Sequence, residues 1–296
     1  MGITSTGEVS EIKRSSAVLS ASVQTEGVDS RDDVYVGFAW SPSESGLCAD
    51  GDFESSETPV QNVSDGAYSA SLGGLSDGTT YYYASFTKVG DVYVFSSVKK
   101  FITEELPEGA VDLGLSVLWA NCNVGAESPE EYGGYYAWGE TEEKTYYSWK
   151  TYKWCNGNYG SLTKYCTYSS YGRVDNKTTL DPEDDVAHVQ WGGNWRMPTN
   201  AERDELRTEC DWEWTSVNGV SGYLITGPSG NSIFLPAAGY RDGGVVDYRG
   251  ARGYYWSATL YSLGSDCAYY LNFLDDRYGG GGRYRDFGHT VRPVTE

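Results

Sequence analysis

The feature that most limits the fold of this chain is a series of short segments in which apolar and polar residues alternate. Alternation with a period of two places one side of an extended strand in a core, and turn residues separate successive segments. Because repeated short strands of this kind are typical of two packed antiparallel sheets, the N-terminal third of the chain predicts a β-sandwich. The segments cover residues 17–23, 34–40, 67–72, 80–86 and 92–98.

One segment of this domain carries a more specific pattern. Residues 75–83, with the sequence LSDGTTYYY, resemble the tyrosine-corner segment of fibronectin type III domains. In that family a leucine packs, a Pro-Gly-Thr turn follows, and a tyrosine hydroxyl bonds back to the backbone; here Asp77 replaces the proline, which loosens the turn. The resemblance implies a fibronectin III/Ig-like sandwich over residues 1–103 that serves as a spacer, with no catalytic grouping.

A second domain follows an acidic linker. Residues 104–109 combine glutamates with Pro107 and Gly109 and show no periodicity, which is typical of a linker. Residues 110–296 then form a domain of short strands, long ordered loops and two helices. The expected elements are a strand over 110–120, loops over 140–177, a helix from Pro182 to about Gln190 capped by Asp181, a helix through Glu209 that starts at the capping box Thr199–Glu202, and strands at 223–226 and 232–235.

The C-terminal part has an unusual composition. No Lys, Glu, Gln or Met occurs between Trp214 and Thr295, whereas the first 213 residues hold thirty-four of them. Solvation gives a surface no reason to prefer Asp to Glu and Arg to Lys so completely. Codon chemistry offers one, because random replacement of the adenines in an AAC codon yields Tyr, Asp, Gly, Ser and Arg but never Lys, Glu, Gln or Met. Tyr, Gly, Ser and Arg are also typical of adaptable binding loops.

Several motifs of residues 110–296 resemble one known family, the Fibrobacter succinogenes major paralogous type of domain. The motifs are VDLGLSVLWANCNVG, YYAWGE, DNKTTL, WGGNWRMPT, IFLPAAGYR, YYWSA and the closing VRPV. That family shares the C-type lectin fold with the formylglycine-generating enzymes. The same fold serves as the variable protein of diversity-generating retroelements, in which a copy with errors at adenines overwrites the 3′ end of the gene. The resemblance implies an α+β C-type lectin fold, and the codon pattern adds a diversified binding surface without enzymatic activity.

The resemblance also implies roles for single residues of the C-terminal part. Trp256, Ser257, Leu271, Phe273, Val291 and Val294 are expected in the core. The diversified positions are expected on one exposed ligand-binding surface, where tyrosines and arginines anchor the ligand. These positions are Tyr248, Arg249, Tyr261, Leu263, Asp266, Cys267, Tyr270, Asp275, Asp276, Arg277, Tyr278, Arg283, Tyr284, Arg285, Asp286 and His289.

Charge and composition limit the partners. A formal net charge of −20 argues against nucleic acid or an anionic membrane surface. We expect an external protein or glycan as ligand, no cofactor, and a secreted or cell-surface location, with any signal sequence or anchor preceding the present start. A fixed glycan-binding site of exposed Tyr and Trp and an undiversified adhesive module are the alternatives.

Catalysis is the competing hypothesis for the second domain. His188 and His289 are the only histidines, so a multi-histidine metal site or a Ser/His arrangement has few residues to draw on. The formylglycine-generating enzymes hold copper with a pair of thiols, and the tail offers only Cys267, far in sequence from Cys210. The sequence therefore predicts that the protein is not an enzyme.

Two local features stay open at the level of sequence. Asp275 and Asp276 could act as paired carboxylates or as calcium ligands, but adjacent residues of a strand face opposite sides, which favours a plain surface role. Cys155 and Cys166 are close enough in sequence either to form a loop disulfide or to remain free thiols.

Overall fold

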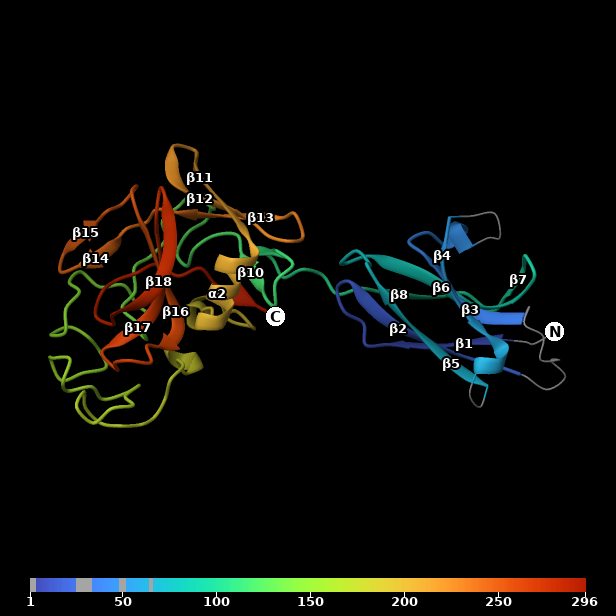
Figure 1. Ribbon diagram of the computed structural model, residues 1–296, viewed down its shortest axis with the longest axis horizontal. Coiled ribbons are helices and arrows are strands. Elements are labelled where there is room, and N and C mark those ends of the chain that lie inside the picture. Colours follow the sequence, from blue (N-terminus) through green and yellow to red (C-terminus); the bar gives the residue numbers. More distant parts are fainter. Residues whose placement is uncertain (1–3, 25–33, 48–51, 64–65) are drawn as a thin grey trace. The chain divides into compact units, whose positions relative to one another are not determined.

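The chain divides into two compact units, both built mainly from antiparallel strands. The computed structural model describes residues 4–24, 34–47, 52–63 and 66–296. Unit 1 is Met1–Pro107 and unit 2 is Glu108–Glu296 (Figure 1). The predicted class, mainly β with some α, is confirmed at this level.

Unit 1 consists of two antiparallel sheets. The first has the order β1-β2-β5, and the second has the order β4-β3-β6-β7 with β8 paired to β6. All five predicted segments contain a strand, although the last one ends at Phe95 instead of residue 98. The sequence misses β1, β4 and β8, which are short or mostly polar. The strands are β1 (Thr4–Ser10), β2 (Ser16–Val23), β3 (Val34–Ser41), β4 (Glu54–Pro59), β5 (Ala67–Gly73), β6 (Thr80–Val89), β7 (Val92–Phe95) and β8 (Lys99–Ile102), with 3₁₀ turns η1 (Glu44–Leu47) and η2 (Val60–Asn62).

The residues of the tyrosine-corner segment form the contact that the family resemblance implies. Leu75 and Tyr81 are buried in the core between the sheets. The Ser76 amide donates a hydrogen bond to the Tyr81 hydroxyl at 2.9 Å. Among the three consecutive tyrosines, Tyr81 is therefore the one that fixes the turn.

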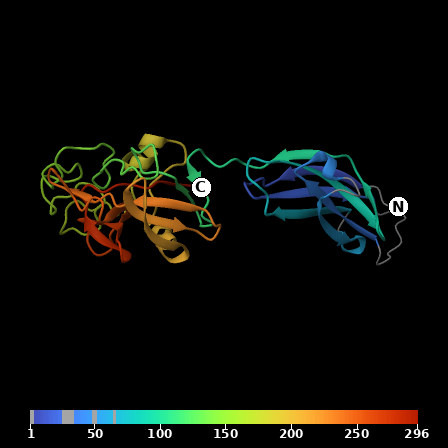
Figure 2. The same ribbon diagram turned by 90° about the horizontal axis from the view of Figure 1, so that it is seen from above.

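Unit 2 contains four small sheets, and its first and last strands both pair with β10. β10 lies between β9 and β19, so both ends of the unit meet in one sheet. Figure 2 shows the long irregular segment of the unit, in green, beside the orange and red strands. The strands are β9 (Ala110–Val111), β10 (Leu118–Ala120), β11 (Asp211–Val217), β12 (Val220–Thr226), β13 (Ser232–Pro236), β14 (Tyr240–Asp242), β15 (Val245–Asp247), β16 (Gly253–Leu260), β17 (Cys267–Leu274), β18 (Arg277–Tyr284) and β19 (Val294–Thr295).

One predicted helix is confirmed and the other is corrected. α2 (Asn200–Glu209) is capped by Thr199, whose side chain and that of Glu202 form the expected capping box. The predicted helix from Pro182 is instead a 3₁₀ turn, η3 (Pro182–Asp184), followed by α1 (Val186–Trp191). The cap is Asp185, which accepts hydrogen bonds from two amides of α1. Asp181 makes no capping bond, because its carboxylate is held by lysines.

The predicted strand over residues 110–120 is also wrong in part. It is broken into β9 and β10 by a turn in which Gly114 has a φ of +77°, a conformation that favours glycine. A Cβ atom at Gly114 would also lie 2.9 Å from the Ser229 amide nitrogen. The backbone must therefore turn here, although the run of apolar residues resembles one strand.

The core of unit 2 contains all six residues that were expected there, Trp256, Ser257, Leu271, Phe273, Val291 and Val294. Arg292 is buried in this core, and no carboxylate of the described residues forms an ion pair with it. Its guanidinium donates to the Asn123 side-chain oxygen at 2.8 Å and to the Phe234 carbonyl at 2.8 Å. Cys155 and Cys166 are free thiols, so the disulfide alternative is not the one observed.

Candidate ligand-binding surface

The sheet β16-β17-β18 organises most of the C-terminal residues that the sequence singles out. Its register places Tyr255, Leu271 and Phe273 on one face, which packs on a core cluster of unit 2. Tyr254, Tyr270 and Arg283 extend from the opposite face by alternation along the strands. A parallel bridge between Tyr255 and Thr290 sets residues 288–291 beside β16, and a bridge between Arg241 and Gly288 adds β14.

Aromatic rings on this opposite face enclose the guanidinium of Arg283. We call Tyr240, Tyr254 and Phe287 the aromatic cage. The guanidinium carbon lies 4.7 Å from the Tyr240 ring, 6.0 Å from the Tyr254 ring and 4.3 Å from the Phe287 ring. A cation held against ring faces at such distances is stabilised by their quadrupoles. Arg283 is therefore half-buried and fixed across the sheet instead of projecting freely into solvent.

His289 lies beneath this cage and is fully buried, which corrects its predicted place on the exposed surface. Its ring stacks on Trp256 at 3.9 Å and lies 5.5 Å from the rings of Tyr254 and Tyr270. Burial, followed by the charge of Arg283, lowers the pKa of His289 well below its usual value. The ring is therefore neutral at neutral pH, and among the described residues neither ring nitrogen has a hydrogen-bond partner.

Arg285 and Asp286 are buried as well, so their predicted exposure is wrong. The Arg285 guanidinium donates to the Tyr152 hydroxyl at 2.8 Å and to the backbone carbonyls of Tyr165, Ser265 and Lys164 at 2.9, 2.8 and 3.1 Å. Through these hydrogen bonds Arg285 holds the long irregular loop segment against the C-terminal tail. Burial raises the pKa of Asp286 to about 6.

The other predicted surface residues separate into exposed and half-buried sets. Their contacts place them on more than one part of the unit: Tyr278 stacks on Trp212 at 4.4 Å, and Tyr261 packs on Tyr269 at 4.9 Å. The exposed set is Tyr248, Arg249, Leu263, Asp275, Asp276, Arg277, Tyr278 and Tyr284, and the half-buried set is Tyr261, Asp266, Cys267, Tyr270 and Arg283.

A groove lies at the turn end of β17 and β18. It has a volume of about 390 Å³ and is lined by Arg252, Asn272, Leu274, Arg277, Tyr278, Gly279 and Gly280. Only Arg277 and Tyr278 of these residues were predicted for the surface. The sequence analysis missed Arg252 and Asn272, and also Tyr240 and Tyr254 nearby. All four lie in the stretch without Lys, Glu, Gln or Met, and this composition is the signal that could have identified them.

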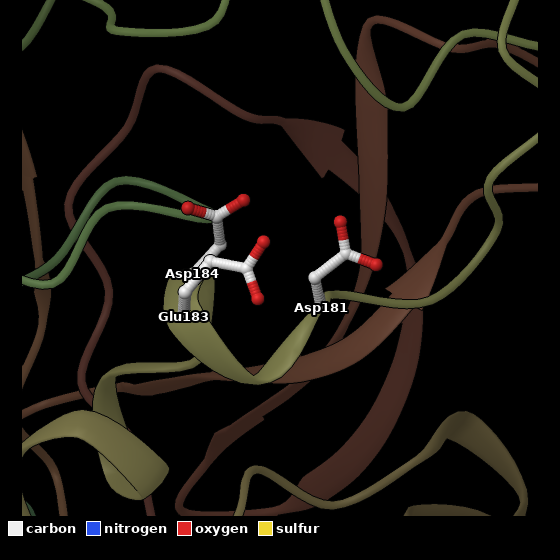
Figure 3. Close-up of side chains that lie close together, drawn as sticks. All are labelled: Asp181, Glu183 and Asp184. Atoms are coloured by element: carbon white, nitrogen blue, oxygen red, sulfur yellow. The ribbon is translucent and has the colours of Figure 1, made fainter.

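The acidic turn Asp181, Glu183 and Asp184 is the one group of the described residues with spacing suited to a metal ion (Figure 3). Its charges are already compensated. The Lys164 ammonium lies 2.6 Å from a carboxylate oxygen of Asp181 and 2.5 Å from one of Asp184, and Lys177 lies 2.5 Å from Asp181. A divalent cation would have to displace these ammonium groups, so the turn is a structural ion-pair network.

Asp275 and Asp276 form the two-residue turn between β17 and β18. Both are exposed, and Asp276 faces Arg277 at 3.6 Å with both side chains more than 70% exposed. They are turn residues instead of strand residues, and they belong to no group of three metal-ligating side chains among the described residues. The arrangement fits a solvated hairpin end.

The accessible tyrosines and arginines of the tail thus extend from an ordered β scaffold. No protein-family model matches the chain, and no curated protein matches it. Among solved structures, it is similar to the sensor domain of the anti-sigma factor RsgI4 of Pseudobacteroides cellulosolvens, with 19% identity over 36% of this chain and 96% of that chain and a TM-score of 0.29. It is also similar to the fn3 domain of the human collagen alpha-1(XX) chain, with 21% identity over 36% of this chain and 85% of that chain and a TM-score of 0.23.

These neighbours are fibronectin-like and sensor domains that span about a third of the chain. The described part of the chain contains no helix that is both long and apolar enough to cross a bilayer.

Proposed function

We propose that residues 110–296 form a C-type lectin-fold domain of the retroelement-diversified kind, which binds an external protein ligand without chemistry and is displayed at the cell surface by the fibronectin III-like unit. One observation carries the proposal. Along β17 the buried residues Ala268, Leu271 and Phe273 are interspersed with half-buried residues such as Tyr270, and the neighbouring strand β18 carries accessible or half-buried tyrosines, arginines and glycines without a buried residue. Such a layout lets the accessible residues change while the packing of the scaffold is kept.

The side chains that could support catalysis are placed poorly for it. His289 is neutral and shielded beneath Arg283. Burial raises the pKa of Cys267 to about 12, so it is a thiol at neutral pH and neither a thiolate nucleophile nor a ready metal ligand. His188 is bonded to the Trp195 carbonyl at 3.3 Å, where it supports the loop after α1. These environments favour binding over chemistry.

The DNA around the gene tests the proposal. We expect a nearby reverse transcriptase gene and an imperfect copy of the 3′ end that carries adenines wherever the two sequences differ. If the flanks hold neither, the retroelement proposal fails. The exposed tyrosines would then belong to a fixed adhesive or glycan-binding surface. Binding to a glycan array, measured with and without calcium, would distinguish a glycan-binding surface from an adhesive one.

A further inference from the structure

β18 is an edge strand whose outer side is free to pair. The sheet order ends at β18, and the register with β17 runs from Leu274–Arg277 to Cys267–Tyr284 without a shift. Cys267 bonds through its amide and carbonyl to Gly264 and Tyr261, away from β18. Because bonded and non-bonded pairs alternate in an antiparallel ladder, the backbone groups of Gly282, Gly280 and Tyr278 and the amide of Tyr284 point outward, whereas the Tyr284 carbonyl already accepts a hydrogen bond from the Phe287 amide at 3.3 Å. No strand of the described residues pairs with them.

The edge carries little of the usual protection against pairing. Natural edge strands carry charged side chains, especially Lys, or Pro or a bulge that prevents the addition of a further strand. β18 reads RYGGGGRY, with no Lys, Pro or bulge; of its two charged residues, Arg283 is held in the aromatic cage and Arg277 lies at the turn end. The outer edge is therefore long, regular and open.

The four glycines of β18 have two different explanations. A Cβ atom at Gly280 would lie 1.5 Å from Arg203 Nη1 and 2.7 Å from the Tyr270 carbonyl, and one at Gly282 would lie 2.5 Å from the Tyr261 ring. Packing therefore demands these two. Gly279 and Gly281 have their nearest neighbours at 4.0 and 3.9 Å, so packing does not demand them. They leave the accessible face of β18 bare beside the groove.

The groove next to this bare strip carries positive charge. Arg252 lies over the Tyr248 ring at 4.2 Å and forms no ion pair with a carboxylate of the described residues. Arg277 meets only the solvent-exposed carboxylate of Asp276 among them. A carboxylate reaching the groove past Gly279 would find both guanidinium groups, and arginine forms bidentate hydrogen bonds with carboxylates.

We propose that the outer edge of β18 binds an extended segment of the protein ligand as an added strand, with an acidic side chain of that segment in the groove between Arg252 and Arg277. The strand-addition proposal specifies the kind of protein segment that the binding function proposed above would recognise. It rests on that function only in assuming that the ligand is a protein. Main-chain hydrogen bonds supply affinity in such strand addition, and side-chain pockets supply specificity.

The test uses the full chain and a phage-displayed library of random ten-residue peptides as the probe. We expect the enriched peptides to contain Glu or Asp among strand-forming residues. Their binding should slow amide hydrogen exchange at Gly280 and Gly282, whose amides face outward, and leave Gly279 and Gly281 nearly unchanged. Exchange that slows equally at all four glycines, or at none, would overturn the inference.

Two matched pairs of variants separate edge pairing from other contacts. Tyr284→Pro removes an outward amide and the ring, whereas Tyr284→Ala removes only the ring, so we expect the first to bind at least tenfold more weakly than the second. Arg277→Gln should weaken binding of acidic peptides about fivefold, and Arg277→Lys should recover part of it. Equal binding by Tyr284→Pro and Tyr284→Ala would contradict strand addition.

The same selection with a library of small folded proteins distinguishes the two proposals. If it yields binders that tolerate Tyr284→Pro but lose affinity when Tyr248 and Arg249 are replaced by alanine, the surface binds protein and only strand addition is wrong. If neither library yields a binder to the tail, both proposals lose their support.

Discussion

Replacement of Arg285 by methionine should destabilise unit 2 strongly. The guanidinium is fully buried and donates four hydrogen bonds, to one tyrosine hydroxyl and three backbone carbonyls. A buried acceptor left without a partner costs about 1–3 kcal/mol. We take the lower end of this range for each of the four acceptors. Removal of the buried charge also removes its desolvation penalty, which offsets part of the cost, so we expect the free energy of unfolding to fall by about 3–4 kcal/mol.

The loss can be followed by thermal unfolding with tryptophan fluorescence. Nine of the ten tryptophans lie in unit 2, with Trp40 as the exception, so the signal reports on that unit. For a unit of this size 1 kcal/mol corresponds to roughly 2–4 °C, which places the expected drop in Tm at about 6–16 °C. Arg285→Lys keeps the charge but loses the planar fork, and we expect about half of that drop.

Arg277 provides the matched control, because it belongs to the same tail and is 74% exposed. Arg277→Met should change Tm by about 1 °C or less. If Arg285→Met also melts within about 1 °C of the original protein, the buried network contributes nothing measurable. Arg285 would then behave as the surface residue that the sequence predicts, and the structural reasoning would be refuted.

Three further outcomes follow from the structure. Gly280→Ala should cost about 1–3 kcal/mol because the added carbon meets Arg203, whereas Gly279→Ala should change the free energy of unfolding by about 0.5 kcal/mol or less in urea titrations. The pKa of Asp286 is raised from 3.8 to about 6 in the folded state, so the stability of the protein falls as the pH rises from 3.8 to 6 and Asp286 ionises in its buried site. Asp286→Asn should therefore raise the free energy of unfolding by about 2–3 kcal/mol at pH 8 and change it hardly at all near pH 3.5. Added calcium should leave the Tm of unit 2 unchanged, since lysines already neutralise the acidic turn, and a rise of several degrees would reveal a cation site.

Local sequence rules predict the elements whose causes are local. The capping box at Thr199 fixes the start of α2, and alternating segments mark five strands of unit 1. The same rules fail where a distant contact decides. Asp181 is a good cap by residue type, but Lys164 and Lys177 hold its carboxylate, and Asp185 caps the helix instead.

The candidate site shows the same division. Residue type separates the tail from the rest of the chain, yet it cannot distinguish Arg277 from Arg285. The first ends in solvent, and the second ends among carbonyls of residues such as Lys164 and Tyr165, far away in sequence. Composition predicts which stretch is unusual, whereas tertiary contacts decide which of its residues a ligand can reach.

This division has a consequence for the retroelement proposal, because diversification must spare the positions that hold the fold. Packing restricts Gly280, Gly282 and Arg285, whereas it leaves room for change at the neighbouring positions Gly279 and Tyr284. If a template copy overwrites this stretch, its codons for the open positions should carry adenines that differ from the gene, and its codons for the restricted positions should match the gene. Adenine differences spread evenly over both kinds of position would mean that the copy is blind to the fold, and that the scaffold described above is not what limits variation.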